Sequence, residues 1–312
     1  MLTLNEIRKK TINFPPLYKR KLEELSPIVT EKDNVSVMQW NSLAQGFFNY
    51  SLSPKECHVW STRKWRILEV IVSCNPDVIL FEELNHFEFL VEQLGSEYEG
   101  TFKKKPDSGC LRFNEPSDGC AIFYRKSKFN LIAKKTINYE NRNQVAILKK
   151  LSFKTTSKAF IVGVTHLKSS IAEESFKIRK EEIVSLVEML SNFRNLNETK
   201  PLPLIFGGDF NEEPFQYCYN HMYQNGYSST YEDLEKKKDY DLYWSTWKVR
   251  KTEVKRVIDF LFLSNNDWQI CSRLLPPTDV DNIRLPSMKY PSDHLSLFAQ
   301  YQFKENLSEK NN

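Results

Sequence analysis

The chain has 312 residues, of which 40% are apolar and 13% aromatic, so a packed globular core is expected rather than general disorder. Lys and Arg total 44 against 40 Asp and Glu. The resulting charge of +4 suits an anionic substrate, but it is too small to indicate a nucleic-acid-binding domain by itself. The six cysteines form no C-x-x-C pair, which argues against zinc ribbons and thioredoxin-type redox chemistry.

The sequence carries no sign of a membrane span or a secretory signal. No run of about 18 apolar residues is present, so we expect no transmembrane segment. The N-terminus is basic but lacks the apolar stretch of a signal peptide. A cytoplasmic location is therefore predicted, with a mitochondrial one as the alternative.

The predicted elements begin with a polar, basic N-terminal arm over residues 1–33. Residues 35–40 alternate apolar and polar side chains, which predicts a strand, and residues 60–74 have helical spacing. A continuous apolar run over 77–81 predicts a strand buried on both faces. The elements that follow are a helix over 86–94, strands near 97–104, 119–125, 145–153 and 159–165, a long helix over 172–193, a buried strand over 203–206, and strands near 257–263 and 294–303.

Helices alternate with strands early in the chain, and strands dominate later. This order predicts two packed sheets flanked by helices, forming one α/β catalytic domain over residues 34–304. A polar tail is expected over 305–312.

Polar residues stand directly after several predicted buried strands, where α/β enzymes place their sites. A charged group inside an apolar run is unfavourable unless it is paired or bound to a metal. Any one of these residues alone could be a helix cap or an ion-pair partner, but that explanation does not suit six positions together. They are Asn41, Glu82–Glu83, His166, Asp209 with Asn211, Asp259, and Asp293–His294.

The segment Gly207–Gly208–Asp209–Phe210–Asn211 is the most specific local signal. In an extended backbone Asp209 and Asn211 would point to the same side, and the glycines would let another chain or a phosphate come close. The aspartate could then activate a water while the amide holds a phosphoryl oxygen. A β-turn with an Asx cap is the alternative interpretation.

Glu83 suits Mg²⁺, because this hard cation prefers carboxylate oxygen, and Glu82 is expected to face solvent. His294 is favoured as the histidine that contacts phosphate, with Asp259 as the carboxylate that fixes its tautomer. We expect His58 and His221 at the surface and assign no role to His86.

These residues, in this order, resemble the endonuclease/exonuclease/phosphatase superfamily. The carrying motifs are the Asn after the first strand, E-E-L after the second, then T-H-L, G-D-F-N, V-I-D-F and S-D-H, over about residues 35–303. The resemblance implies a four-layer αββα sandwich with a metal site at one edge of the paired sheets. Segments such as 38–45 and 285–295 are similar to the deadenylase-related branch, and within it to a group that removes the 2′-phosphate of NADP⁺ and NADPH.

The resemblance also implies roles for individual residues. Mg²⁺ would be held by Glu83 with Asn41 nearby, and Mn²⁺ is the alternative ion. Lys105, Lys168 and Arg250 would bind the dinucleotide, a role that suits the charged donors of Lys and Arg. Without the resemblance, Lys105 could equally belong to a solvated charge run. The catalytic set would be Asp209, Asn211, Asp259, Asp293 and His294, with His166 binding the scissile phosphate.

Three departures from the family pattern bear on cofactor affinity and on the preference between NADP⁺ and NADPH. Ser170 stands where an arginine is expected, and Glu82 stands where a glutamine is usual. Residues 255–257 read Lys-Arg-Val in place of R-H-T.

The residues predict a Mg²⁺-dependent hydrolase of phosphate esters that is a monomer, and the resemblance implies that it converts NADP(H) to NAD(H) and phosphate. The first alternative is a poly(A)-specific 3′-exoribonuclease, which would use the same metal core but needs a groove that stacks adenines. The second alternative is an inactive adaptor that binds a nucleotide or an RNA-decay complex, although intact Glu83, Asp209 and His294 argue against it.

Overall fold

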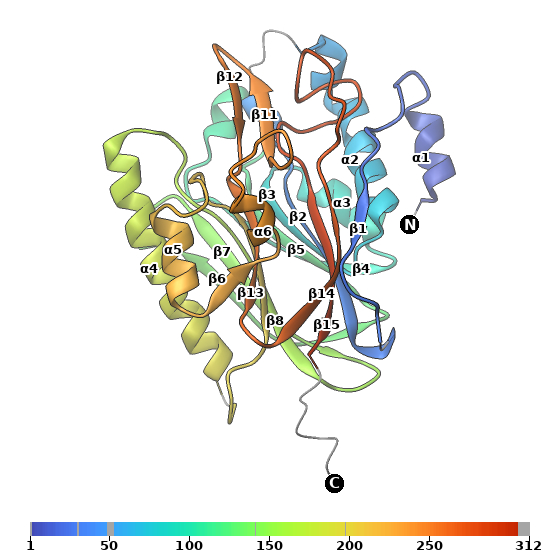
Figure 1. Ribbon diagram of the computed structural model, residues 1–312. Helices are drawn as coiled ribbons and strands as arrows, with labels where there is room; N and C mark the ends of the chain where they lie inside the picture. The colour runs from blue at the N-terminus through green and yellow to red at the C-terminus, as the bar shows by residue number, and fades with distance from the viewer. Residues whose placement is uncertain (1, 30, 49–52, 141, 197, 305–312) are drawn as a thin grey trace.

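Two large β-sheets pack face to face, and helices cover both outer faces (Figure 1). The computed structural model describes residues 2–29, 31–48, 53–140, 142–196 and 198–304, so the predicted tail at 305–312 lies outside the described residues. Helices α1, α2 and α3 lie over one sheet, and α4 and α5 lie over the other (Figure 1). The predicted four-layer αββα sandwich is confirmed.

The first sheet has seven strands in the order β1-β14-β15-β2-β3-β5-β4. Strands β2 and β3 run parallel because α2 carries the chain back between them, and the other neighbours are antiparallel. The bounds are β1 Leu22–Glu24, β2 Asn34–Asn41, β3 Val78–Leu84, β4 Tyr98–Lys104, β5 Gly119–Arg125, β14 Trp268–Leu274 and β15 Leu297–Phe303, with helices α1 Leu4–Lys10, α2 Trp60–Cys74 and α3 Phe87–Leu94.

The second sheet has six strands in the order β10-β13-β9-β8-β7-β6, and a hairpin of β11 and β12 stands at the top of Figure 1. The bounds are β6 Phe129–Asn138, β7 Val145–Phe153, β8 Ala159–His166, β9 Leu204–Asp209, β10 Tyr227–Ser229, β11 Thr246–Val249, β12 Glu253–Arg256 and β13 Asp259–Ser264. The helices are α4 Glu173–Asn195, α5 Tyr217–Gln224 and α6 Glu232–Glu235, and the short 3₁₀ helices are η1 Glu31–Asp33, η2 Gln45–Phe47, η3 Lys55–His58 and η4 Gly109–Phe113.

The main core lies between the two sheets, where side chains such as Val37, Leu80, Ile147 and Ile205 are fully buried. Burying one such side chain typically stabilises a fold by about 1.5–3 kcal/mol. The sheets approach closely at Gly207, where an added Cβ would come within 2.8 Å of Leu80 Cδ1. The first glycine of the G-G-D motif thus admits a neighbouring chain segment, one of the two uses predicted for it.

The segment predicted as an N-terminal arm contains a helix and an edge strand. Strand β1 pairs antiparallel with β14, with Leu22 opposite Leu274. The partner strand lies about 250 residues further along the chain, so no local pattern could reveal the pairing. Within the described residues, no helix combines the length and apolar character needed to cross a membrane. All six cysteines belong to the described part and are free thiols.

Candidate active site

Strand register brings the predicted polar residues together at one edge of the two sheets. In the antiparallel pair β9–β13, Asp209 lies opposite Asp259, and in the parallel pair β8–β9, His166 lies beside Asp209. Asn41, at the end of β2, donates its side-chain amide to Asp209 Oδ2 at 2.9 Å. This hydrogen bond joins the first sheet to the second at the site.

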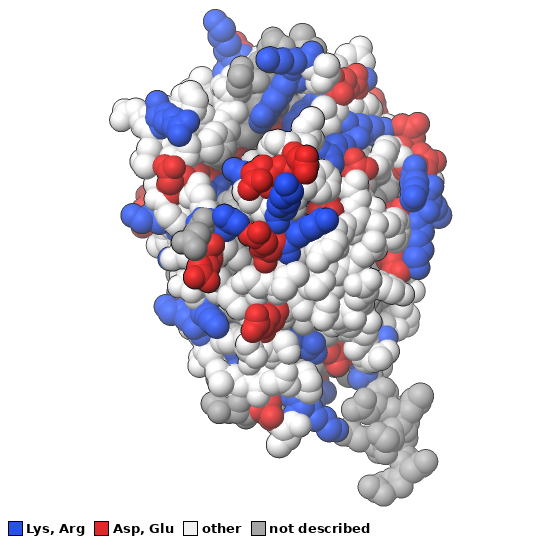
Figure 2. Space-filling view, turned by 90° about the vertical axis from the view of Figure 1, so that its left-hand side faces the viewer, with Lys and Arg blue, Asp and Glu red and all other residues white. Residues whose placement is uncertain are grey.

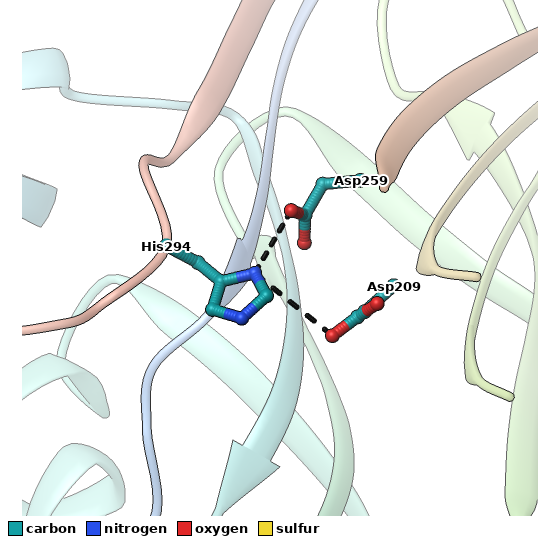
Figure 3. A group of neighbouring side chains, drawn as sticks. All are labelled: Asp209, Asp259 and His294. Atoms are coloured by element: carbon teal, nitrogen blue, oxygen red, sulfur yellow. Dashed lines mark hydrogen bonds and ion pairs between the residues drawn. The ribbon is translucent and has the colours of Figure 1, made fainter. Parts of the chain in front are cut away.

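Asp209, Asp259 and His294 form a buried cluster (Figure 3). His294 Nδ1 lies 2.8 Å from Asp259 Oδ2 and 3.9 Å from Asp209 Oδ2. The predicted pairing of Asp259 with His294 is therefore confirmed. The facing atoms of all three residues lie within 4.8 Å of one another, so the cluster could also hold a metal ion.

Burial and neighbouring charges shift the protonation of this cluster. Burial and the charge of Asp259 raise the pKa of Asp209 to about 7. Burial alone would lower the pKa of His294, but the charges of Asp259 and Asp293 raise it to about 9. At neutral pH the imidazole is therefore a cation, and the raised pKa of Asp209 makes its carboxylate a better proton acceptor than that of an ordinary aspartate.

A cleft of about 920 Å³ opens above the cluster. Its wall includes nine of the predicted site residues: Glu83, Lys105, His166, Lys168, Asp209, Asn211, Arg250, Asp293 and His294. Asn41 and Asp259 lie behind this wall, where they contact Asp209 and His294. Lysine and arginine side chains gather at the upper end of the face in Figure 2, the end at which β11 and β12 lie in Figure 1.

Glu82 and Glu83 have unlike environments because β3 is irregular at its end. Its pairing with β5 shifts register between Phe81 and Leu84, and Glu83 has a positive φ of 50°. Glu83 lines the cleft as predicted. The expectation that Glu82 faces solvent is wrong, since its side chain is fully buried and accepts a hydrogen bond from Gln39 Nε2 at 2.9 Å. Burial and the charges of Asp259 and Asp209 raise the pKa of Glu82 well above its ordinary value.

The carboxylate of Glu83 is suited to act as a ligand for a cation. Burial raises its pKa, and the nearby charges of Asp293 and Asp118 add to the effect, whereas Lys105 opposes it. Carboxylates grouped in this way repel one another, and a hard divalent cation among them would relieve the repulsion.

The backbone bends between Asp209 and Asn211, so the predicted extended conformation is wrong. Asn211 has a φ of 52° and donates its backbone N–H to Asp209 Oδ1 at 2.9 Å, as in an Asx turn. Its side-chain amide lies 3.0 Å from His166 Nε2. Burial, and then the charge of Lys105, lower the pKa of His166 well below its ordinary value, so this imidazole is neutral.

The predicted basic residues surround the cleft, and a further lysine joins them. Lys105 lies 2.7 Å from Asp118 Oδ2, and Arg250 lies 3.9 Å from Asp293 Oδ2. Lys248 was not predicted as a site residue, yet its Nζ lies 2.6 Å from Asp293 Oδ2 and 3.3 Å from His294 Nε2. Burial alone would raise the pKa of Asp293, but Lys248 and His294 hold it well below the usual range.

The i, i+2 spacing of Thr246, Lys248 and Arg250 could have identified Lys248 from the sequence. All three line the cleft: Thr246 and Lys248 lie on one face of β11, and Arg250 directly follows the strand. Of the other histidines, His86 stacks on Trp60 and lies 3.1 Å from Glu115 Oε2. His58 and His221, expected at the surface, are half-buried.

The fold and this site agree with the sequence comparisons. Residues 38–294 match the Endonuclease/Exonuclease/phosphatase family, so the chain belongs to this family and is a hydrolase. Within the family its relatives include the nocturnins, which confirms the branch predicted from the motifs. Rat nocturnin is 35% identical over 97% of this chain and 74% of its own length.

A solved structure and a more distant relative support the same placement. The human nocturnin catalytic domain, solved with a bound sulfate anion, matches with a TM-score of 0.74 and 31% identity, covering 92% of this chain and 97% of that one. The Ccr4 3′-5′-exoribonuclease subunit of the CCR4-Not complex from Emericella nidulans is 24% identical over 94% of this chain. This chain spans 55% of the length of that Ccr4 subunit.

Proposed function

We propose that this protein is a Mg²⁺-dependent phosphatase that removes the 2′-phosphate of NADP⁺ and NADPH. The observation that carries the proposal is the combination of a buried Asp209–His294 pair with Lys105, Lys168, Lys248 and Arg250 around one cleft. A dinucleotide carries a pyrophosphate besides its 2′-phosphate, so its binding requires several cations beyond the reacting centre. The motif resemblance to 2′-phosphatases of NADP(H) and the 35% identity to rat nocturnin add support.

We propose that Glu83 and Asn41 hold the Mg²⁺ ion, with Mn²⁺ as the alternative. Oxygen ligands suit both cations, and the like charges near Glu83 favour a cation there. When bound, the ion would act as a Lewis acid on a phosphoryl oxygen. The cluster of Asp209, Asp259 and His294 suits proton transfer better, because His294 Nδ1 already pairs with Asp259 and Asp209 accepts a hydrogen bond from Asn41.

The scissile phosphate is proposed to lie against His294 and Lys248. His294 Nε2 and Lys248 Nζ are only 3.3 Å apart, and both groups carry positive charge. An anionic oxygen that accepts hydrogen bonds from both would relieve their repulsion. Asn211 and His166 also line the cleft, and the 3.0 Å contact between Asn211 Nδ2 and His166 Nε2 holds both side chains beside the proposed phosphate position. Each hydrogen-bond donor to the phosphate often contributes about 3 kcal/mol to transition-state stabilisation.

Asp209 is the proposed proton-transfer residue. Its pKa near 7 allows it to take a proton from the attacking water or to return one to the 2′-oxygen of the leaving group. Asp259 holds the His294 ring in place through Nδ1, which leaves Nε2 for the phosphate. Asp293 keeps Lys248 beside the ring.

The assay for this function is the incubation of purified protein with NADPH and Mg²⁺, followed by measurement of phosphate and NADH. We expect one phosphate for each NADH formed, and loss of turnover when EDTA removes the cation. No phosphate release under conditions in which oligo(A) is shortened would refute the proposal.

The second candidate function is a poly(A)-specific 3′-exoribonuclease. The observation that favours it is that Phe47, Phe48 and Phe113 line the cleft, and Phe113 is 63% exposed. Exposed aromatic rings can stack bases, and the relation to a Ccr4 exoribonuclease points the same way. This function predicts a steep loss of oligo(A) binding with rising salt.

A monomeric state and a cytoplasmic location, with a mitochondrial one as the alternative, complete the proposal. Light scattering of the purified chain and imaging of a tagged copy in cells would test these two points.

A further inference from the structure

A buried network of charged side chains lies behind the segment that carries Lys168. Arg179 and Glu182 are one turn apart on α4, and Glu212 follows β9. All three residues are about 1% exposed, and Arg179 Nε lies 3.5 Å from Glu212 Oε2. Charged side chains this deeply buried must be paired, and losing one partner is strongly destabilising.

This network binds the backbone of residues 168–170 at three points. Glu182 Oε2 accepts the backbone N–H of Lys168 at 2.8 Å. Arg179 Nη1 donates to the carbonyl oxygens of Lys168 and Ser170 at 2.9 and 2.8 Å. Ser170 has a φ of 98°, a conformation that non-glycine residues rarely adopt unless surrounding contacts impose it.

Arg179 is itself held from the other side. Glu212 pairs with its guanidinium, and Glu212 Oε1 accepts the backbone N–H groups of Tyr217 and Cys218 at 2.7 and 3.4 Å. These two residues begin α5, which packs beside α4 in Figure 1. The network is therefore anchored in two helices, and residues 168–170 are the loop that it restrains.

The opposite side of this loop forms part of the cleft wall. Lys168, Ser169 and Ser170 line the cleft, whereas Arg179 and Glu182 do not. At its N-terminal end the loop is tied to the catalytic residues, because Leu167 N–H donates to the Asp209 carbonyl and Asn211 donates to the Leu167 carbonyl. The loop is thus fixed between the catalytic edge and the buried network.

We infer that Arg179 and Glu182 are positioning residues that fix the loop so that Lys168 binds the phosphate groups of the substrate. This inference rests on the proposed function in one respect, namely that the cleft binds a phosphate-bearing substrate. Neither residue lines the cleft, so their loss should act on KM through Lys168 and leave the chemistry at Asp209 and His294 in place.

A double-mutant cycle of Arg179→Met and Lys168→Ala tests the inference. We expect Arg179→Met to raise KM about tenfold, equivalent to about 1.4 kcal/mol, with kcat changed less than about twofold. In the Lys168→Ala background, Arg179→Met should change KM by less than about twofold. An unchanged KM, an equal rise in both backgrounds, or a fall in kcat as large as the rise in KM would overturn the inference.

Arg194→Met is the matched control. Arg194 also lies on α4, donates to a backbone carbonyl, that of Leu202, and pairs with a carboxylate, that of Asp267, but it does not line the cleft. We expect wild-type kinetics for this variant. A KM effect equal to that of Arg179→Met would show a general effect of weakening α4 and would overturn the inference.

Two substitutions of Glu182 keep the test decisive if Arg179→Met does not fold. Glu182→Gln retains an oxygen that can accept the Lys168 N–H, whereas Glu182→Leu removes it. We expect a near-wild-type KM for Glu182→Gln. Glu182→Leu should raise KM when Lys168 is present but not in the Lys168→Ala background. Equal KM values for the two variants would overturn the inference.

The choice of substrate separates this inference from the proposed function. The cycle is measured with whichever of NADPH and oligo(A) the wild-type protein hydrolyses. Failure to hydrolyse NADPH refutes the proposed function, and the same KM comparison with oligo(A) still decides the role of the network.

Discussion

Asp259 Oδ2 lies 2.8 Å from Nδ1 of His294, and neither residue is more than 3% exposed. The carboxylate therefore fixes which ring nitrogen faces the cleft and stabilises the imidazolium. Removing its charge while keeping its shape tests this relationship.

For Asp259→Asn we expect kcat to fall about 10²- to 10⁴-fold, the usual contribution of positioned acid–base groups, with a small change in KM. Steady-state kinetics with NADPH measure both values. Asp281→Asn is the control, because Asp281 pairs with Lys289 outside the cleft. Retention of full kcat in Asp259→Asn would remove the Asp259–His294 pair from the mechanism.

The cation should bind through Glu83. In wild-type protein, Mg²⁺ at about 100 times its dissociation constant should stabilise the fold by about 2.7 kcal/mol, which raises Tm. We expect Glu83→Gln to abolish this Tm shift and turnover, because it removes the charged ligand from the cleft. Glu88→Gln, on the exposed side of α3, is the control. An unchanged Mg²⁺-induced Tm shift in Glu83→Gln would place the ion elsewhere.

Ser170 stands on the cleft wall where the family pattern has an arginine. We expect Ser170→Arg to lower KM for NADPH about five- to tenfold, because a charge-assisted hydrogen bond to phosphate is gained. Ser191→Arg adds the same charge at an exposed position of α4 and should leave KM unchanged. Equal KM values for the two variants would show that this wall does not contact phosphate.

Glu235 lies outside the cleft, and the burial of its carboxyl predicts that the stability of the fold depends on pH. The residue is 2% exposed, and its carboxyl accepts hydrogen bonds from Tyr219 and Ser229. Burial raises the pKa of this carboxyl from 4.5 to about 7. Because the folded-state pKa is the higher one, its stabilising contribution is complete below about pH 4.5 and is lost as pH rises through 7.

The corresponding variant is Glu235→Gln. Between pH 4.5 and 8.5, the free energy of unfolding of wild type should fall by about 3 kcal/mol relative to this variant. Urea unfolding at several pH values measures the difference. Glu188→Gln, at an exposed position of α4, is the control. Its free energy of unfolding should change with pH as that of wild type does. Parallel curves for Glu235→Gln as well would contradict the prediction.

The sequence predicted which residues lie together in space where a residue follows a buried strand. Asn41, His166 and Asp209 belong to this group, since strand ends meet at one sheet edge and their positions follow from topology. Asp259 and His294 were paired in the prediction on chemical grounds, and the structure places them in contact.

The predictions failed where tertiary structure changes the local pattern. Glu82 is buried because strict alternation puts it on the same inner face of β3 as Val78 and Leu80, between the two sheets. The register shift after Phe81 re-aims Glu83 instead, and no sequence period encodes such a bulge. Asn211 is bent back by an Asx turn. Lys248 was missed because only its i, i+2 spacing from Arg250 marks it in the sequence, whereas the residues it contacts, Asp293 and His294, lie about 45 residues further along the chain. Contacts of this kind depend on the whole fold rather than on a window of sequence.

The central claim is that the basic cleft selects a 2′-phosphorylated dinucleotide. The most direct measurement compares kcat/KM for NADP⁺, NADPH and oligo(A) at equal enzyme and Mg²⁺ concentrations. We predict that phosphate is released from both dinucleotides with kcat/KM at least about 100-fold above that for oligo(A), a difference of about 2.7 kcal/mol in transition-state binding. Efficient shortening of oligo(A) with no phosphate released from NADP⁺ or NADPH would contradict the claim.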